Sequence, residues 1–166
     1  LDGLKDAIKT LGTRFDKNDK ATELINSIEE LENKFKESDT KGADVLVLFA
    51  APGSTMIATP KSYIGSLVEI VGGNNIVKDD KSSYVTYSKE EISKLNPKKV
   101  LVMMHAMPEQ TKAALEKEFK SDTAWQSIEA IKNNNIVYLD NTYFGMSANL
   151  KVIEGLDILR EIVAGE

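Results

Sequence analysis

The run Asp44-Val-Leu-Val-Leu-Phe-Ala50 determines the fold class. Its apolar residues are continuous instead of alternating with polar ones, and the run has the length of a strand. Such a strand is typical of a parallel sheet that is covered by helices on both faces. Two later runs, 100–104 and 136–139, have the same character. The sequence therefore predicts a sheet with at least three buried strands, to which residues 75–77 add a short fourth.

The segments between these strands carry apolar residues at helical spacing. The first expected helix contains Leu4, Ile8 and Leu11 and ends near Gly12. Further helices are expected at about residues 20–35, 62–71, 88–95, 109–119, 124–132 and 152–162. Ser88, with a glutamate three residues later, has the pattern of a capping box. Because strands alternate with helices, we expect an α/β fold: a three-layer, Rossmann-like lobe with a mainly parallel sheet and helices on both faces.

The composition is that of an ordinary globular domain, with 42% hydrophobic and 28% charged residues among 166. A net charge of -5 argues against nucleic acid as a partner, because phosphates require a concentrated basic face. The sequence has no cysteine, which excludes disulfides, thiolate nucleophiles and cysteine metal sites. No apolar run approaches the roughly 20 residues that span a bilayer. Since the chain begins at Leu1 without an initiator methionine, we expect a processed protein or a piece of a longer one.

Ligands of open α/β sheets bind beyond the carboxyl ends of the strands. Three segments follow such ends here, at residues 50–60, 105–108 and 140–147. In the first, small and hydroxyl-bearing residues predict a flexible loop in which Ser54, Thr55 and Met56 face the ligand. This segment lacks the glycine spacing of a dinucleotide loop and the lysine of a phosphate loop. A small-molecule α/β enzyme that holds a phosphate group at residues 52–55 remains an alternative from another class.

The second segment carries His105, the only histidine in the sequence. Imidazole is a common iron ligand, and its neutral form dominates near pH 7. Met107 lies in the same segment and is a further candidate for ligand contact. The alternative is that His105 only forms hydrogen bonds within its loop. No cluster of Asp, Glu and His at metal spacing accompanies it, so a bare zinc or calcium site is not expected.

The third segment brings Tyr143, Phe144 and Met146 to the same edge of the predicted sheet. Aromatic and thioether groups around a histidine suit a large, flat, apolar ligand. Alternatively, Phe144 and Met146 seal the last helix onto the sheet. A serine hydrolase is not supported, because no Gly-x-Ser-x-Gly elbow is present. We therefore expect a binding protein and not an enzyme.

Two longer motifs resemble a known family. Gly72-Gly-Asn-Asn-Ile-Val77 and the segment 87–102, Tyr-Ser-Lys-Glu-Glu-Ile-Ser-Lys-Leu-Asn-Pro-Lys-Lys-Val-Leu-Val, are similar to the C-terminal lobe of helical-backbone substrate-binding proteins. These proteins serve ABC importers for siderophores, haem and cobalamin. Within that group, Met104-His-Ala-Met-Pro-Glu-Gln110 and Tyr143-Phe-Gly-Met-Ser-Ala-Asn149 resemble the haem-binding lipoproteins of iron-regulated surface determinant systems. The resemblance extends over most of the chain from Lys20 onward.

The resemblance implies that residues 38–166 are the C-terminal lobe of a two-lobed receptor, and that residues 1–37 include the end of the helical connection between the lobes. It implies haem as the ligand, with His105 as one axial ligand and a methionine of an N-terminal lobe as the other. Glu90 matches a glutamate that the family presents to the ABC permease. Possible partners also include surface haem-relay proteins, and the location is the extracellular face of the membrane through a lipid anchor. A ferric-siderophore or cobalamin receptor is the alternative within the family.

Overall fold

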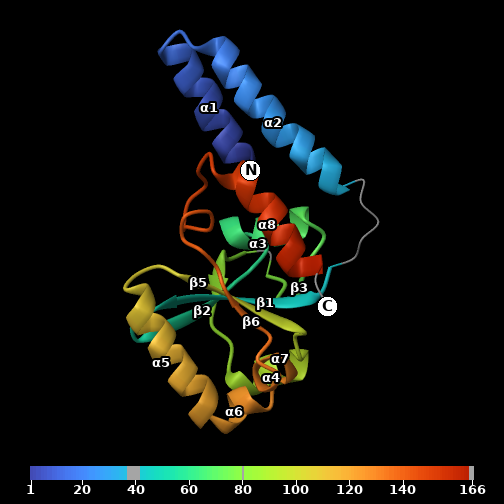
Figure 1. The fold of residues 1–166 in the computed structure, drawn as a ribbon, viewed down its shortest axis with the longest axis vertical. Helices are drawn as coiled ribbons and strands as arrows, with labels where there is room; N and C mark the ends of the chain where they lie inside the picture. The colour runs from blue at the N-terminus through green and yellow to red at the C-terminus, as the bar shows by residue number, and fades with distance from the viewer. Residues whose placement is uncertain (37–41, 80, 165–166) are drawn as a thin grey trace.

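The computed structural model describes residues 1–36, 42–79 and 81–164 and is a mixed α/β structure (Figure 1). The helices are α1 (Asp2–Arg14), α2 (Asn18–Lys36), α3 (Tyr63–Ile70), α4 (Lys89–Leu95), α5 (Pro108–Ser121), α6 (Thr123–Gln126), α7 (Glu129–Lys132) and α8 (Val152–Ala164). The strands are β1 (Asp44–Ala51), β2 (Ser54–Ala58), β3 (Asn74–Asn75), β4 (Tyr84–Val85), β5 (Lys99–Met104) and β6 (Ile136–Tyr138). Among the described residues, no helix is both long enough and apolar enough to cross a membrane.

The strands form one sheet in the order β4-β2-β1-β5-β6, and β3 pairs with the start of β1. Strand β1 runs parallel to β5 and β3, and β5 runs parallel to β6. The pairs β1–β2 and β2–β4 are antiparallel. The register aligns Val45 with Lys99 and Ala50 with Met104, so the two central strands end together. The mainly parallel sheet predicted from the sequence is thus confirmed.

Alternate residues of the central strands enter two separate hydrophobic cores. Val45, Val47 and Phe49 face the core that α3 and α8 cover, and Leu46 and Leu48 face the core that α4 to α7 cover. Figure 1 shows these two groups of helices on opposite sides of the sheet. Because residues 45–50 of β1 are buried on both faces of the sheet, all of them are apolar. This explains the continuous apolar run and confirms the three layers.

Residues 54–58 form strand β2, so the prediction of a flexible loop at 50–60 is wrong. Ala51 pairs with Ser54, which leaves Pro52 and Gly53 as a tight turn between antiparallel strands. Gly53 has a φ of 75°, a conformation that glycine adopts without steric cost. A turn between two strands has no following helix N-terminus, which removes the main support for a phosphate loop at residues 52–55.

Two helices also differ from the prediction in their bounds, and one short strand was not predicted. Helix α1 continues through Gly12 to Arg14, because this glycine provides room for α2: a Cβ atom there would lie 2.4 Å from the Cβ of Ala21. The helix expected at 124–132 is split into α6 and α7, since Ile128 has extended backbone and its side chain is buried in the core. Strand β4 was not predicted at all. The capping box at Ser88 is confirmed.

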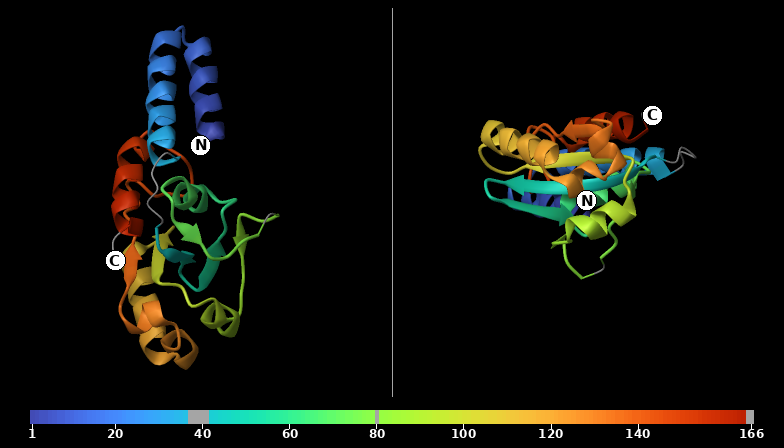
Figure 2. Two further views of the ribbon diagram at one scale, coloured as in Figure 1. Left: turned by 90° about the vertical axis from the view of Figure 1, so that its right-hand side faces the viewer. Right: turned by 90° about the horizontal axis from the view of Figure 1, so that it is seen from below.

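Helices α1 and α2 form an antiparallel arm that projects from the part of the molecule containing the sheet, as the views in Figures 1 and 2 agree. They bury a small core of their own, with Ile8, Ala21 and Ile28 at its centre. The arm joins the rest of the structure through α2, which contacts α8 and α3. The boundary predicted between residues 37 and 38 lies within the segment outside the described residues and stays a prediction.

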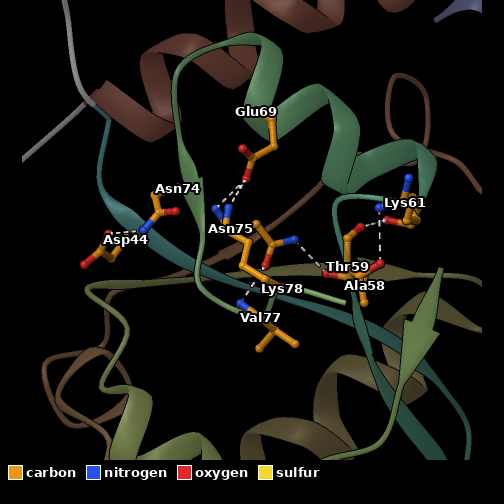
Figure 3. Close-up of polar contacts among 10 residues, drawn as sticks. Asp44, Ala58, Thr59, Lys61, Glu69, Asn74, Asn75, Val77 and Lys78 are labelled. Carbon is orange, nitrogen blue, oxygen red and sulfur yellow. Dashed lines mark hydrogen bonds and ion pairs between the residues drawn. The ribbon is translucent and has the colours of Figure 1, made fainter. Parts of the chain in front are cut away.

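The Gly72–Val77 motif ties the end of β2 to the start of the following loop (Figure 3). Asn75 is completely buried, and its side-chain amide donates a hydrogen bond to the carbonyl of Ala58 at 2.8 Å. Its Oδ1 atom accepts one from the backbone N–H of Val77 at 3.3 Å. Thr59, the next residue after Ala58, donates through Oγ1 to the carbonyl of Ser82 at 2.6 Å. These bonds hold the backbone at Val77 and Ser82 near the end of β2.

Candidate functional site

The candidate site lies at the edge where β1 and β5 end. His105 follows β5 directly, and its backbone N–H donates to the carbonyl of Ala50 at 3.0 Å, which extends the parallel ladder by one bond. The last residue of the strand, Met104, is buried, whereas the side chain of His105 is exposed. The sheet therefore fixes the backbone of His105 and presents its imidazole to solvent.

The imidazole lies beside a row of aromatic rings. Its centroid is 5.7 Å from that of Phe49, and the two ring planes differ by 29°. The Phe49 ring in turn contacts Tyr84, with centroids 5.0 Å apart. Within the described part of the chain, the imidazole nitrogens form no hydrogen bond. This does not support the alternative in which His105 only forms hydrogen bonds within its loop.

The loop after His105 is short and well anchored. Thr111 donates through Oγ1 to the carbonyl of Ala106 at 2.8 Å and through its backbone N–H to the carbonyl of Met107 at 2.9 Å. Met107 takes a positive φ of 46° at the N-cap of α5, and 52% of its surface is exposed. The structure therefore places this thioether near the imidazole along the chain and accessible to a ligand.

The segment 140–147 separates into a buried and an exposed part. The carboxylate of Asp140 accepts a hydrogen bond from the backbone N–H of Thr142 at 2.8 Å, which lowers the pKa of this carboxyl and starts a tight turn. Met146 is 44% exposed and Tyr143 is half-buried, with the Lys151 ammonium 5.7 Å from its ring. Tyr143 and Met146 are thus accessible to a ligand from this loop.

Phe144 is not accessible, and its assignment to the ligand site needs correction. Its side chain is 1% exposed and belongs to the core between the sheet and α8. Gly155 of α8 makes room for it, since a Cβ atom there would lie 3.4 Å from the Cε1 atom of the ring. The alternative in which Phe144 seals the last helix onto the sheet is therefore the one that the structure supports.

The residues predicted from β2 divide between the two faces of the sheet. Met56 pairs with Phe49 and packs on the same core, so it lies on the face of the aromatic row. Thr55 pairs with Ala50, which belongs to the other core. Together with Ser54 at the tip of the hairpin, it lines a pocket of about 370 Å³ toward α5 and α6. Successive residues of a strand point to opposite faces, so Thr55 and Met56 lie on different sides of the sheet. Contact of Ser54, Thr55 and Met56 with a ligand stays a prediction.

Sequence reasoning missed two residues of the site, Phe49 and Tyr84. Phe49 was assigned to the buried strand only, although it stands next to the last residues of that strand at the ligand edge. Tyr84 gave no usable signal, because β4 has only two residues and its pairing with β2 depends on segments distant in sequence. Burial raises the pKa of the Tyr84 phenol, so this hydroxyl stays protonated at neutral pH.

Glu90 lies away from this edge, in the first turn of α4, where its side chain is exposed. The helix start is well defined, because Ser88 accepts from the N–H of Glu91 and the Glu91 carboxylate accepts from the N–H of Ser88. These bonds lower the pKa of the Glu91 carboxyl. The capping box leaves the Glu90 carboxylate free of any role in the helix cap.

No group of three or more His, Cys, Asp or Glu side chains that could hold a metal ion is found in the described ranges. A single imidazole does not hold a bare ion tightly, but haem iron already has four porphyrin nitrogens and takes protein ligands only at its axial positions. The arrangement at the edge of β1 and β5 consists of one accessible imidazole, aromatic rings and accessible thioethers. It fits a large apolar ligand that brings its own metal.

Comparison with known proteins shows the family to which this chain belongs. The family model described as "Periplasmic binding protein" matches residues 1–143. The chain therefore belongs to the periplasmic binding protein family.

Individual members of this family are similar to the chain in sequence and in structure. The high-affinity heme uptake system protein IsdE of Staphylococcus aureus is 36% identical over 98% of the chain, which spans 56% of that relative. The crystal structure of S. aureus IsdE complexed with heme superposes with a TM-score of 0.86 at 36% identity, covering 98% of this chain and 64% of that one. The crystal structure of an ABC transporter substrate-binding protein from Listeria monocytogenes superposes with a TM-score of 0.83 at 33% sequence identity. The match covers 96% of this chain and 63% of that one. None of these three is named as an enzyme, in agreement with the expectation of a binding protein.

Proposed function

We propose that this chain is the C-terminal lobe of a haem receptor of an ABC importer, and that His105 binds the haem iron as one axial ligand. The observation that carries the proposal is the exposed imidazole at the carboxyl edge of the parallel strands, with no hydrogen bond to its nitrogens among the described residues. A neutral imidazole of this kind has a lone pair available for iron. Similarity to a protein that is named for heme uptake and was crystallised with heme supports the ligand.

The accessible side chains of the loops that follow β5 and β6 favour haem over an anionic iron chelate. Met107, Met146 and Tyr143 offer apolar and polarisable surface, which suits a porphyrin face. A ferric siderophore with several negative charges would be matched better by arginines. The sequence has two, and both lie elsewhere: Arg14 is at the end of α1, and Arg160 donates to the carbonyl of Val71.

The remaining parts of the receptor belong to the same proposal. The second axial ligand would come from a methionine of an N-terminal lobe, since the chain spans 56% of its staphylococcal relative. Glu90 would contact the membrane permease, because it is exposed and has no part in the capping box. The receptor would be held by a lipid anchor at the extracellular face of the membrane, where surface haem-relay proteins could deliver its ligand.

Titration of the chain with hemin, followed by absorbance in the Soret region, tests the proposal. The chain should give a saturable band, and His105→Ala should abolish it or shift it to the spectrum of non-specifically bound hemin. Ser93→Ala is the control, because this residue of α4 bonds the Ser127 hydroxyl and lies among the helices that cover the other core; it should leave the band unchanged. Identical spectra for the wild type and His105→Ala would reject His105 as the ligand.

A further inference from the structure

The His105 ring contacts the aromatic ring of Phe49. Metal-binding histidines generally donate a hydrogen bond from their second ring nitrogen to a carboxylate, a carbonyl or water, and this bond fixes the ring. In the part of the chain that the structure describes, neither imidazole nitrogen of His105 has such a bond. The contact that the ring does make is the stack on Phe49, with centroids 5.7 Å apart and planes 29° apart.

Phe49 is itself held firmly from behind. Its side chain is 7% exposed, at the end of the central strand β1, and Tyr84 of β4 packs against it at 5.0 Å with the ring planes tilted by 52°. Stacked and tilted arrangements at these separations are the favourable ones for aromatic rings. The three rings therefore form a row, Tyr84–Phe49–His105, whose inner members are buried or half-buried and whose outer member is exposed.

Backbone pairing with β2 sets the inner end of the row, and the Asn75–Ala58 bond in Figure 3 supports the residue with which Tyr84 pairs. Tyr84 pairs with Ala58 in the antiparallel ladder, and Ala58 accepts the hydrogen bond of the buried Asn75 amide. The backbone N–H of Thr59 donates to the carbonyl of Ser83 at 3.0 Å, directly before Tyr84. The position of Tyr84 is thus set by the pairing of β4 with β2.

We propose that Phe49, supported by Tyr84, is the positioning residue of the site: its ring holds the His105 imidazole in the orientation from which a ring nitrogen binds haem iron. The inference rests on the proposed function of His105. It assigns to aromatic packing the task that a hydrogen bond performs at most histidine metal sites. Since stacking leaves both nitrogens without a partner among the described residues, it orients the ring without selecting the tautomer.

The first test uses the protein without hemin. Because the sequence contains one histidine, the imidazole Cε1–H and Cδ2–H signals in an NMR spectrum belong to His105. Ring currents of Phe49 should displace these signals from their positions in an unstructured peptide. Phe49→Leu should return them toward those positions, and Phe49→Tyr, which keeps the ring, should restore the displacement. Phe119→Leu is the matched control, since Phe119 is also buried and packs edge-to-face against Trp125 in the other core.

The second test measures hemin binding by the same variants. An aromatic pair contributes about 0.5–1.5 kcal/mol beyond its burial, so Phe49→Leu should weaken binding by roughly 3- to 10-fold. Phe49→Tyr should bind as the wild type does, and Phe119→Leu should show no change beyond its effect on stability. If Phe49→Leu fails to fold, Tyr84→Leu replaces it; that change keeps Phe49 in the core and should displace the His105 signals in the same direction by less.

The two tests separate the two proposals. Unchanged His105 signals in Phe49→Leu would overturn the positioning role, whatever the hemin affinity. In another outcome, the wild-type signals are displaced and return in Phe49→Leu while the wild type binds no hemin. That outcome would confirm that Phe49 orients the ring and would reject the proposed haem function. Equal losses of affinity in Phe49→Leu and Phe119→Leu would show a general effect of a weakened core and would also overturn the positioning role.

Discussion

Replacing Asn75 with alanine is expected to destabilise the fold far more than the same change at the adjacent Asn74. The side chain of Asn75 is completely buried and forms two hydrogen bonds, one to the Ala58 carbonyl at 2.8 Å and one from the Val77 N–H at 3.3 Å (Figure 3). Alanine leaves both backbone groups without these partners in a region from which water is excluded. Asn74 is exposed, and its amide donates to the carboxylate of Asp44 on the surface.

The magnitude follows from the burial of the two groups. A buried polar group that loses its partner costs about 1–3 kcal/mol, and the 3.3 Å bond is the weaker of the two. The free energy of unfolding should therefore fall by about 2–4 kcal/mol in Asn75→Ala, a large part of the roughly 5–15 kcal/mol of a typical domain. In Asn74→Ala it should change by less than about 1 kcal/mol, as for other exposed polar contacts.

Urea denaturation followed by far-ultraviolet circular dichroism measures both effects. With a slope of about 1–3 kcal/mol per molar urea, Asn75→Ala should lower the midpoint by about 1–2 M with no change of slope. Asn75→Asp should be destabilised as well, because a carboxylate oxygen would face the Ala58 carbonyl. If Asn75→Ala and Asn74→Ala had the same midpoint, the argument from buried hydrogen bonds would be refuted.

Three further predictions concern packing and pH. Phe144→Ala should lower the free energy of unfolding by about 3–5 kcal/mol, measured by thermal or urea unfolding. Met146→Ala should change it by no more than about 0.5 kcal/mol. Similar losses in the two variants would contradict the division of this loop into buried and exposed parts. Gly65→Ala should strongly destabilise the fold, because its Cβ atom would lie 1.9 Å from the carbonyl oxygen of Thr59, and a wild-type melting temperature would disprove this contact. Burial raises the pKa of Tyr63 from 10.0 to about 12. The phenol therefore ionises first in the unfolded chain, and its contribution to stability, complete below pH 10, should be lost between about pH 10 and 12. Tyr63→Phe should show a smaller loss in that range, measured by unfolding at each pH.

Most of the fold could be predicted because its central strands are buried on both faces. The run 44–50 is apolar throughout since Val47 and Leu48 enter different cores, and this pattern needs no knowledge of the neighbouring strands. Local capping signals, such as the one at Ser88, were also sufficient for helix starts. The wrong predictions concern segments whose secondary structure depends on the strand that pairs with them. Strand β2 is short and half-polar, and it is a strand because β1 lies beside it.

The site was predicted less completely, for a related reason. His105 and Met107 follow the end of a buried strand, so their place at the ligand edge could be derived from strand order alone. The sequence did not indicate that Phe144 is buried and Met146 is exposed. Both are apolar residues of one loop, and nothing in the loop shows which of them the last helix covers. Tyr84 lies in a stretch with no strand signal, and only its pairing with β2 brings it to Phe49.

The sequence by itself therefore determined the α/β class, the carboxyl edge of the sheet and the single imidazole that lies there, because these depend on the polarity of consecutive residues. The tertiary structure decided which face each residue of β2 points to, which aromatic side chains are buried and which rings form the row behind His105. These outcomes depend on contacts between segments far apart in the chain. No pattern within one segment encodes them, since the register of a strand is set by its partner.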